Sequence, residues 1–158
     1  MKGFILVEAL VAILILSFIM AGIFGVLHIG GSTYHTSLGL VELQQQSRGA
    51  MDRLTRELRQ SKASDLSIIS PGEITFYVPP TNYGAAWIGP IRYYLNNLDN
   101  RIIREYPTGT EKIVANDISS LNFSLNDDLL DIQLTAARTV RGKNLSFSLD
   151  DQVRFRHE

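Results

Sequence analysis

A single carboxylate, Glu8, lies in a run of apolar residues that begins at Phe4 and ends at Leu27. At the centre of a membrane segment, a charged side chain costs roughly 2.5–3.5 kcal/mol on insertion scales, and such residues tend to be functional. Glu8 is near the start of the run, where its side chain could reach the interface and reduce this cost. The carboxylate is therefore either an interfacial residue or a residue with a functional role.

The length of the apolar run predicts a membrane-spanning helix, because about 24 residues can cross a bilayer with some tilt. Lys2 precedes the run and no Lys or Arg follows until Arg48, so the positive-inside rule places the N-terminus in the cytoplasm. A cleavable secretory signal would be shorter and would end in an Ala-x-Ala-like site. A plain signal anchor would explain the length but not Glu8.

The first residues of the chain give a third interpretation. The stretch KGFILVEALVAILIL resembles the N-terminus of type IV pilins and type II secretion pseudopilins. In that family a short basic leader ends in Gly, the mature chain starts with Phe, and Glu follows four residues later. Gly3, Phe4 and Glu8 match these positions, and Lys2 is the basic residue of the leader. Ile5 departs from the Thr that the family often carries.

The resemblance implies that a prepilin peptidase cleaves between Gly3 and Phe4 and that the new amino group of Phe4 is then methylated. Gly3 has no side chain that could obstruct an extended backbone at the cleavage point. In low-dielectric surroundings, the amine of a neighbouring subunit would compensate the carboxylate of Glu8. That pairing would set the axial register between subunits.

After Leu27 the chain becomes more polar, and the sequence predicts that one helix continues from Phe4 to about Ser61. Three charge pairs at i,i+4 spacing are expected on its exposed face: Arg48–Asp52, Asp52–Arg56 and Arg53–Glu57. The run AMDRLTRELRQS resembles the end of this helix in J-type minor pseudopilins and W-type minor pilins. Apolar residues recur at helical spacing and are expected to pack on a globular domain: Val41, Met51, Leu54 and Leu58.

The remainder of the chain alternates apolar and polar residues between Asn-, Asp- and Gly-containing turns, which is typical of β-strands. The order of these segments also resembles the C-terminal domain of the minor subunits. The expected strands are Glu73–Val78, Ile91–Leu95, Arg101–Tyr106, Lys112–Ala115, Ile118–Leu125, Leu129–Ala136 and Leu145–Leu149, and Val153–Arg156 could extend the last.

These elements predict an α+β fold in which a long N-terminal helix packs on an antiparallel β-sheet. The expected parts are a leader peptide at 1–3, a transmembrane or filament-core helix at 4–27, an amphipathic continuation at 28–61 and a globular β domain at 62–158. The segment from Pro79 to Pro90 is expected to be irregular, because Pro and Gly interrupt it. Its residues Tyr83 and Trp87 could contact another subunit or a ligand, or could cap the open edge of the sheet.

Charge and composition argue against several other functions. A net charge of −1 gives no general attraction to nucleic acid or acidic lipid, and the absence of cysteine excludes disulfides and thiolate metal sites. His28 and His35 are two helical turns apart, about 10 Å, which is too far for one metal ion, and the third histidine is His157. Neither a metal nor another cofactor is expected. The clustered acids are interpreted as turn residues rather than calcium ligands: Asp127, Asp128, Asp131, Asp150 and Asp151.

No catalytic motif is present, so we expect an assembly protein rather than an enzyme. The resemblance implies a minor pilin or pseudopilin that takes part in the initiation or tip assembly of a type IV pilus or a type II secretion pseudopilus. Its expected partners are other minor and major subunits, the prepilin peptidase, an inner-membrane assembly platform and, before assembly, membrane lipid. The chain would cross the inner membrane once, with its globular domain in the periplasm, and would later enter the filament.

Two alternatives remain open. One is a single-pass anchored domain without a filament role. The other is a competence- or adhesion-type tip subunit that binds DNA or a surface through basic and aromatic residues. Nucleic acid is the less favoured partner, because strand alternation would scatter the candidate residues over two faces: Arg92, Tyr93, Tyr94, Arg101 and Arg104.

Overall fold

The chain divides by its internal contacts into two units, Met1–Leu38 and Gly39–Glu158, here termed the N-terminal unit and the globular unit. The computed structural model describes residues 2–80 and 86–155, with the backbone alone for residues 2–5. One helix, α1, extends from Lys2 to Leu58 and thus contributes to both units. It is followed by a 3-10 turn, η1, at Ala63–Asp65, and by strands only.

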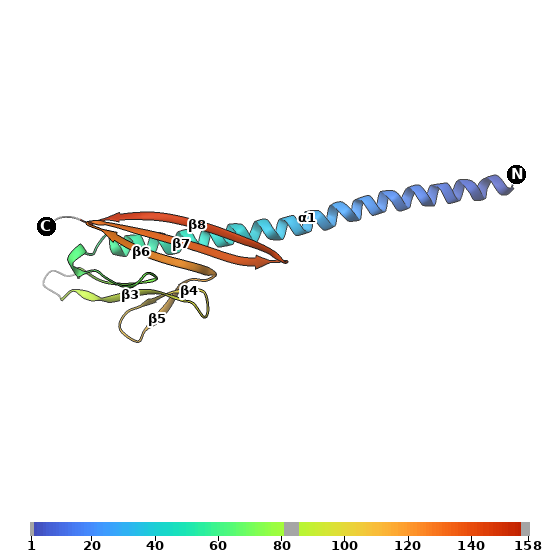
Figure 1. Ribbon diagram of the computed structural model, residues 1–158. Coiled ribbons are helices and arrows are strands. Elements are labelled where there is room, and N and C mark those ends of the chain that lie inside the picture. Colours follow the sequence, from blue (N-terminus) through green and yellow to red (C-terminus); the bar gives the residue numbers. More distant parts are fainter. Residues whose placement is uncertain (1, 81–85, 156–158) are drawn as a thin grey trace. The chain divides into compact units, whose positions relative to one another are not determined.

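Within the globular unit, α1 lies against the strands (Figure 1). Its contact face is a stripe of buried side chains. The predicted contacts of Met51, Leu54 and Leu58 are confirmed, since each is at most 2% exposed. The prediction for Val41 is wrong, because this side chain is 48% exposed and Leu43 is buried instead. The true stripe also includes Ser47, whose hydroxyl donates to the carbonyl of Leu43 at 2.8 Å and so satisfies its hydrogen-bonding need inside the core.

The strands form two antiparallel sheets, and this confirms the predicted α+β class of a long helix packed on antiparallel strands. Sequence analysis did not predict the division into two sheets, nor the first strand. The five-stranded sheet has the order β1-β2-β3-β4-β5, and the three-stranded sheet has the order β6-β7-β8. The strands are β1 Ser67–Ser70, β2 Glu73–Val78, β3 Ile88–Asn96, β4 Arg101–Glu105, β5 Glu111–Ala115, β6 Ile118–Asn126, β7 Leu129–Val140 and β8 Lys143–Arg154.

The two sheets are joined by backbone hydrogen bonds. The amide of Phe123 on β6 donates to the carbonyl of Pro71 at 2.8 Å, and the amide of Ile118 donates to the carbonyl of Asn100 at 2.8 Å. Their inner faces and α1 share one apolar core, whose largest fully buried side chains are Tyr93, Phe76, Leu43, Leu54, Leu58, Ile74, Ile91, Ile102, Ile118, Leu121, Leu130 and Ile132.

Strand β3 begins earlier than the sequence predicted. It includes Gly89 and Pro90, which were expected to prevent regular structure. The pairing with β2 is irregular at this point, between the partners of Phe76 and Val78. A bulge of this kind tolerates a proline, because the missing N–H would have no ladder partner there.

A tight hairpin joins β7 and β8, and both strands are longer than predicted. Arg141 and Gly142 form its turn with φ values of 50° and 76°, as a two-residue hairpin turn requires, and Val140 pairs with Lys143. A Cβ atom on Gly39 of α1 would lie 2.9 Å from Val140 Cγ2, so the turn end of the hairpin packs closely on the first residue of the globular unit. The rest of the hairpin continues along α1 towards Thr55, whose hydroxyl contacts Asp151 at 3.1 Å.

Candidate functional site

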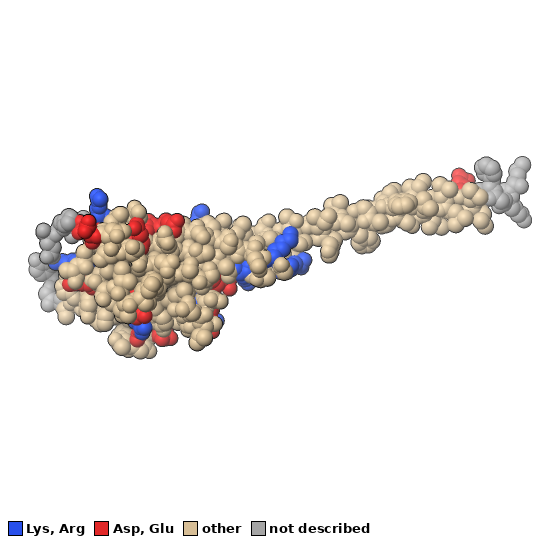
Figure 2. All heavy atoms as spheres, in the orientation of Figure 1, with Lys and Arg blue, Asp and Glu red and all other residues tan. Residues whose placement is uncertain are grey.

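The N-terminal unit presents an uncovered apolar surface. Every residue from position 6 to position 31 is exposed, including Phe18 at 72% and Phe24 at 68%. Figure 2 shows this segment almost entirely in tan, with acidic atoms near its start. Among the described residues, α1 is the one helix long and apolar enough to cross a membrane. Apolar patches of this extent mark contact with lipid or with other proteins.

The predicted processing residues lie at the start of this helix. Lys2, Gly3 and Phe4 are within α1, and their side chains are outside the described part of the structure. Glu8 is exposed and has no ion-pair or hydrogen-bond partner among the described residues. Positions 4 and 8 are one helical turn apart and therefore share a face of α1.

Two hydroxyl groups of the N-terminal unit donate hydrogen bonds to backbone carbonyls of the same helix. The hydroxyl of Ser17 donates to the carbonyl of Ile13 at 2.8 Å, and that of Thr36 to the carbonyl of Ser32 at 2.9 Å. Within the described ranges, no three His, Asp or Glu side chains are grouped so that they could hold a metal ion. His157 lies outside those ranges.

In the globular unit, a partly buried ion pair connects α1 to the inner face of the five-stranded sheet. Arg104 Nε of β4 lies 2.9 and 3.1 Å from the two carboxylate oxygens of Glu57. Arg53 Nε of the same helix lies 3.6 Å from Glu57 Oε1. Burial would lower the pKa of Arg104, but the hydrogen bond and the charge of Glu57 outweigh burial and raise it. The pair thus fixes the helix to the sheet by a charged contact.

Tyr93 lies beside this ion pair and is fully buried. Burial, and secondly the charge of Glu57, raise the pKa of its hydroxyl well above the ordinary value. Among the described residues this hydroxyl has no hydrogen bond of good geometry. Strand alternation could have indicated the contact between Arg104 and Glu57. Arg104 lies two residues from the buried Ile102 and so faces the same side of β4, where its charge requires a carboxylate partner.

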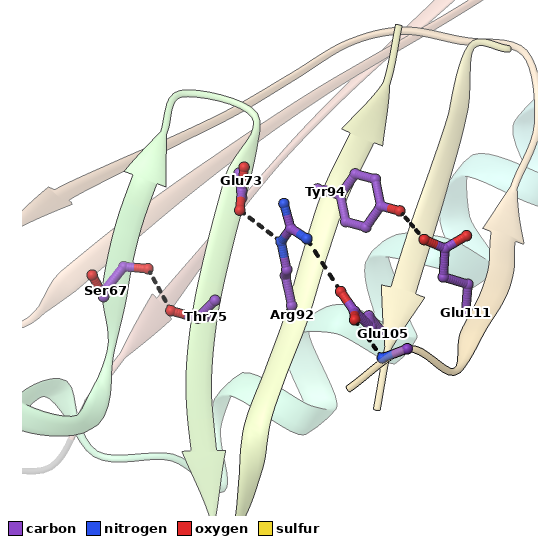
Figure 3. Close-up of polar contacts among 8 residues, drawn as sticks. Ser67, Glu73, Thr75, Arg92, Tyr94, Glu105 and Glu111 are labelled. Atoms are coloured by element: carbon purple, nitrogen blue, oxygen red, sulfur yellow. Dashed lines mark hydrogen bonds and ion pairs between the residues drawn. The ribbon is translucent and has the colours of Figure 1, made fainter. Parts of the chain in front are cut away.

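The outer face of the same sheet carries a second network, drawn in Figure 3. Arg92 Nε donates to Glu73 at 2.6 Å, and Arg92 Nη1 donates to Glu105 at 3.2 Å. Glu105 also accepts the amide of Gly109 at 2.7 Å. This amide, and then Arg92, lower the pKa of Glu105.

Tyr94, on the same strand as Arg92, closes this outer network. Its hydroxyl donates to Glu111 at 2.6 Å, a contact that raises the pKa of Tyr94 to about 12. The guanidinium carbon of Arg92 lies 4.5 Å from the centre of the Tyr94 ring. The network therefore holds β2, β3, β4 and β5 together by side-chain contacts across their register.

The residues proposed for nucleic-acid binding do not form one surface. Tyr93 is buried in the core and Arg104 binds Glu57 of α1, whereas Arg92 and Tyr94 are on the outer face (Figure 3). Arg92 and Arg104 are both paired with carboxylates, and Arg101 lies 3.7 Å from Asp99.

The segment from Pro79 to Pro90 is described only at its two ends, and Tyr83 lies outside the described residues. Trp87 is 42% exposed, and the ammonium group of Lys62 lies 5.7 Å from its ring centre. The contact attaches Trp87 to the segment that follows α1.

No family model, curated protein or solved structure matches the chain. The arrangement itself, a long N-terminal helix packed on antiparallel sheets, fits an α+β pilin-like fold.

Proposed function

We propose that the chain is a minor pilin or pseudopilin, an assembly subunit rather than an enzyme. The observation that carries the proposal is Glu8: one carboxylate, without a described partner, in a helical segment whose described side chains are exposed and apolar. A surface of this kind requires lipid before assembly and neighbouring helices afterwards.

The motif around Glu8 gives the proposal its detail. A prepilin peptidase would cut after Gly3, and methylation would follow at the amino group of Phe4. In the filament, Glu8 of one subunit would accept the cationic amine of its neighbour, since an unpaired carboxylate is unfavourable among apolar helices. Other pilin or pseudopilin subunits and the inner-membrane assembly platform are the corresponding partners, with the globular unit outside the cytoplasm.

A DNA-binding tip has less support, because two of the arginines that it would use are already neutralised by carboxylates and one of its tyrosines is buried. A plain anchored domain would give no role to Glu8.

Replacement of Glu8 tests the register argument. Glu8→Val should leave membrane insertion intact but should reduce cross-linking to partner subunits and incorporation into sheared filaments. Ser17→Val is the matched control, because it also converts an exposed polar residue of this segment to an apolar one. Equal incorporation of both variants would remove the proposed role of Glu8.

A further inference from the structure

The turn end of the β7–β8 hairpin is a basic surface that the proposed function does not use. Between Asp131 and Asp150 the chain contains no acid and three bases, Arg138, Arg141 and Lys143. The register Val140 to Lys143 brings all three to one end of the hairpin. We refer to Arg141, Gly142 and Lys143 as the basic tip.

The charges of the basic tip are not neutralised by the surrounding described residues. The neighbouring Arg138, by contrast, is neutralised, because its Nη1 lies 2.9 Å from Glu42 and its Nε lies 3.8 Å from Asp117. Arg141 and Lys143 are exposed and have no ion-pair partner in the described ranges. Two cations therefore remain available to an anionic partner outside the globular unit.

The hairpin end that carries the basic tip packs on the first residue of the globular unit. Val140 and Leu145 both pack on Gly39, and the hairpin runs from there along α1 towards Thr55. The turn therefore lies beside Gly39, the first residue of the globular unit. From Ala9 to Val41 the chain contains no Lys, Arg, Asp or Glu, so no formal charge lies between Glu8 and Glu42 to compete with the tip.

The separation from a membrane surface can be estimated along the chain. Eleven residues lie between Leu27, the last residue of the apolar run, and Gly39, and as part of α1 they rise about 17 Å. The headgroup layer occupies about 5–8 Å of this distance. The remainder of this path along the chain, up to Gly39, is close to one Debye length, about 8–10 Å.

We propose that the basic tip docks on the anionic phospholipid headgroups of the membrane that holds the apolar helix. The proposal rests on the membrane anchoring that the proposed function includes, but not on processing or filament assembly. Lipid is favoured over a protein partner because only eleven residues separate the apolar run, which the membrane would hold, from Gly39, on which the hairpin packs. Each cation near an anionic surface changes the ratio of docked to undocked molecules by about fivefold, so the pair should account for about 25- to 30-fold.

Contact quenching on the full chain tests the docking. The chain has no cysteine, so Ser146→Cys, on an exposed position of β8, gives a single site for a fluorophore. The labelled, unprocessed chain is reconstituted into phosphatidylcholine vesicles with or without phosphatidylglycerol, each containing a headgroup-spin-labelled phosphatidylcholine as quencher. Arg141→Gln with Lys143→Gln is compared with Arg59→Gln and Lys112→Gln, a control that removes two other exposed cations.

The expected result is stronger quenching with phosphatidylglycerol, which salt reverses and which is lost in the tip variant but kept in the control. Equal quenching in neutral and anionic vesicles would overturn the proposal, as would an increase that persists in the tip variant. Quenching that follows the protein-to-lipid ratio would instead identify another protein as the occupant. Relief by inorganic phosphate beyond that by chloride at equal ionic strength would identify soluble phosphate. Fluorescence of Trp87 reports whether each variant is folded, and none of these readouts depends on cleavage after Gly3.

Discussion

The ion pair between Glu57 and Arg104 should be a principal stabilising contact between α1 and the five-stranded sheet, and Glu57→Gln tests this. The glutamine keeps the size of the side chain but leaves Arg104, whose side chain is 16% exposed, without a carboxylate. Removing one partner of a fully buried pair costs about 3–5 kcal/mol, and an exposed pair is worth about 0–1 kcal/mol. Because the Glu57 side chain is 21% exposed, we expect an intermediate loss of about 2 kcal/mol.

The loss is measured by thermal unfolding of the full chain in detergent micelles, followed through the single tryptophan, Trp87. A decrease of about 2 kcal/mol should lower the midpoint by about 5–8 °C for a unit of this size. Glu42→Gln is the matched control: Glu42 also pairs with an arginine, Arg138, but its side chain is 56% exposed, so its loss should stay below about 1 kcal/mol. If the two variants unfold at the same temperature, the partial burial of the pair between Glu57 and Arg104 does not add to its stabilising effect.

Four further substitutions give separate expectations for the globular unit. Folding lowers the pKa of Glu105 from its ordinary value of 4.5. The stability that its ionised carboxylate contributes is therefore fully present above pH 4.5 and is lost as the pH falls through the lower folded pKa. Glu105→Gln should reduce the loss of stability on acidification, measured as denaturant midpoints against pH. Tyr93→Phe should leave the free energy of unfolding unchanged or higher, because the buried hydroxyl lacks a good hydrogen bond; a decrease beyond about 1 kcal/mol would show that this hydroxyl donates one. Gly49→Ala, in open space on α1, should raise the free energy of unfolding by about 0.5–1 kcal/mol. Gly39→Leu should lower it by about 1–3 kcal/mol, because the side chain would clash with β7 and β8. The opposite order of stability in chemical denaturation would contradict the packing at Gly39.

The sequence predicted the elements whose signal is local. The helix follows from a long apolar run that continues into an amphipathic one, and β2 follows from alternation over six residues. Val41 was misplaced because the buried stripe includes Ser47 and Thr55, which a purely apolar pattern omits. Their hydroxyls bond back to carbonyls of the preceding turn, so they enter the core without an unsatisfied group.

The sequence could not reveal features that depend on tertiary contacts. Strand β1 is a four-residue strand with an irregular register against β2, so it has too short a pattern to recognise. The break between the two sheets falls at Asp117, with φ of 59°, between strands whose sequences resemble those of an ordinary meander. For the candidate site, the sequence identified Glu8 and its neighbours, but the pairing of Arg104 with Glu57 joins residues 47 positions apart and required the structure.

Processing as a pilin-type subunit can be measured through the intact mass of the chain produced together with a prepilin peptidase. We expect a product that begins at Phe4 and carries one additional methyl group on its amino terminus. Gly3→Val, which places a branched side chain at the cleavage point, should yield the uncleaved chain and serves as the control. Retention of Met1 in the unaltered chain, with an active peptidase present, would contradict the account.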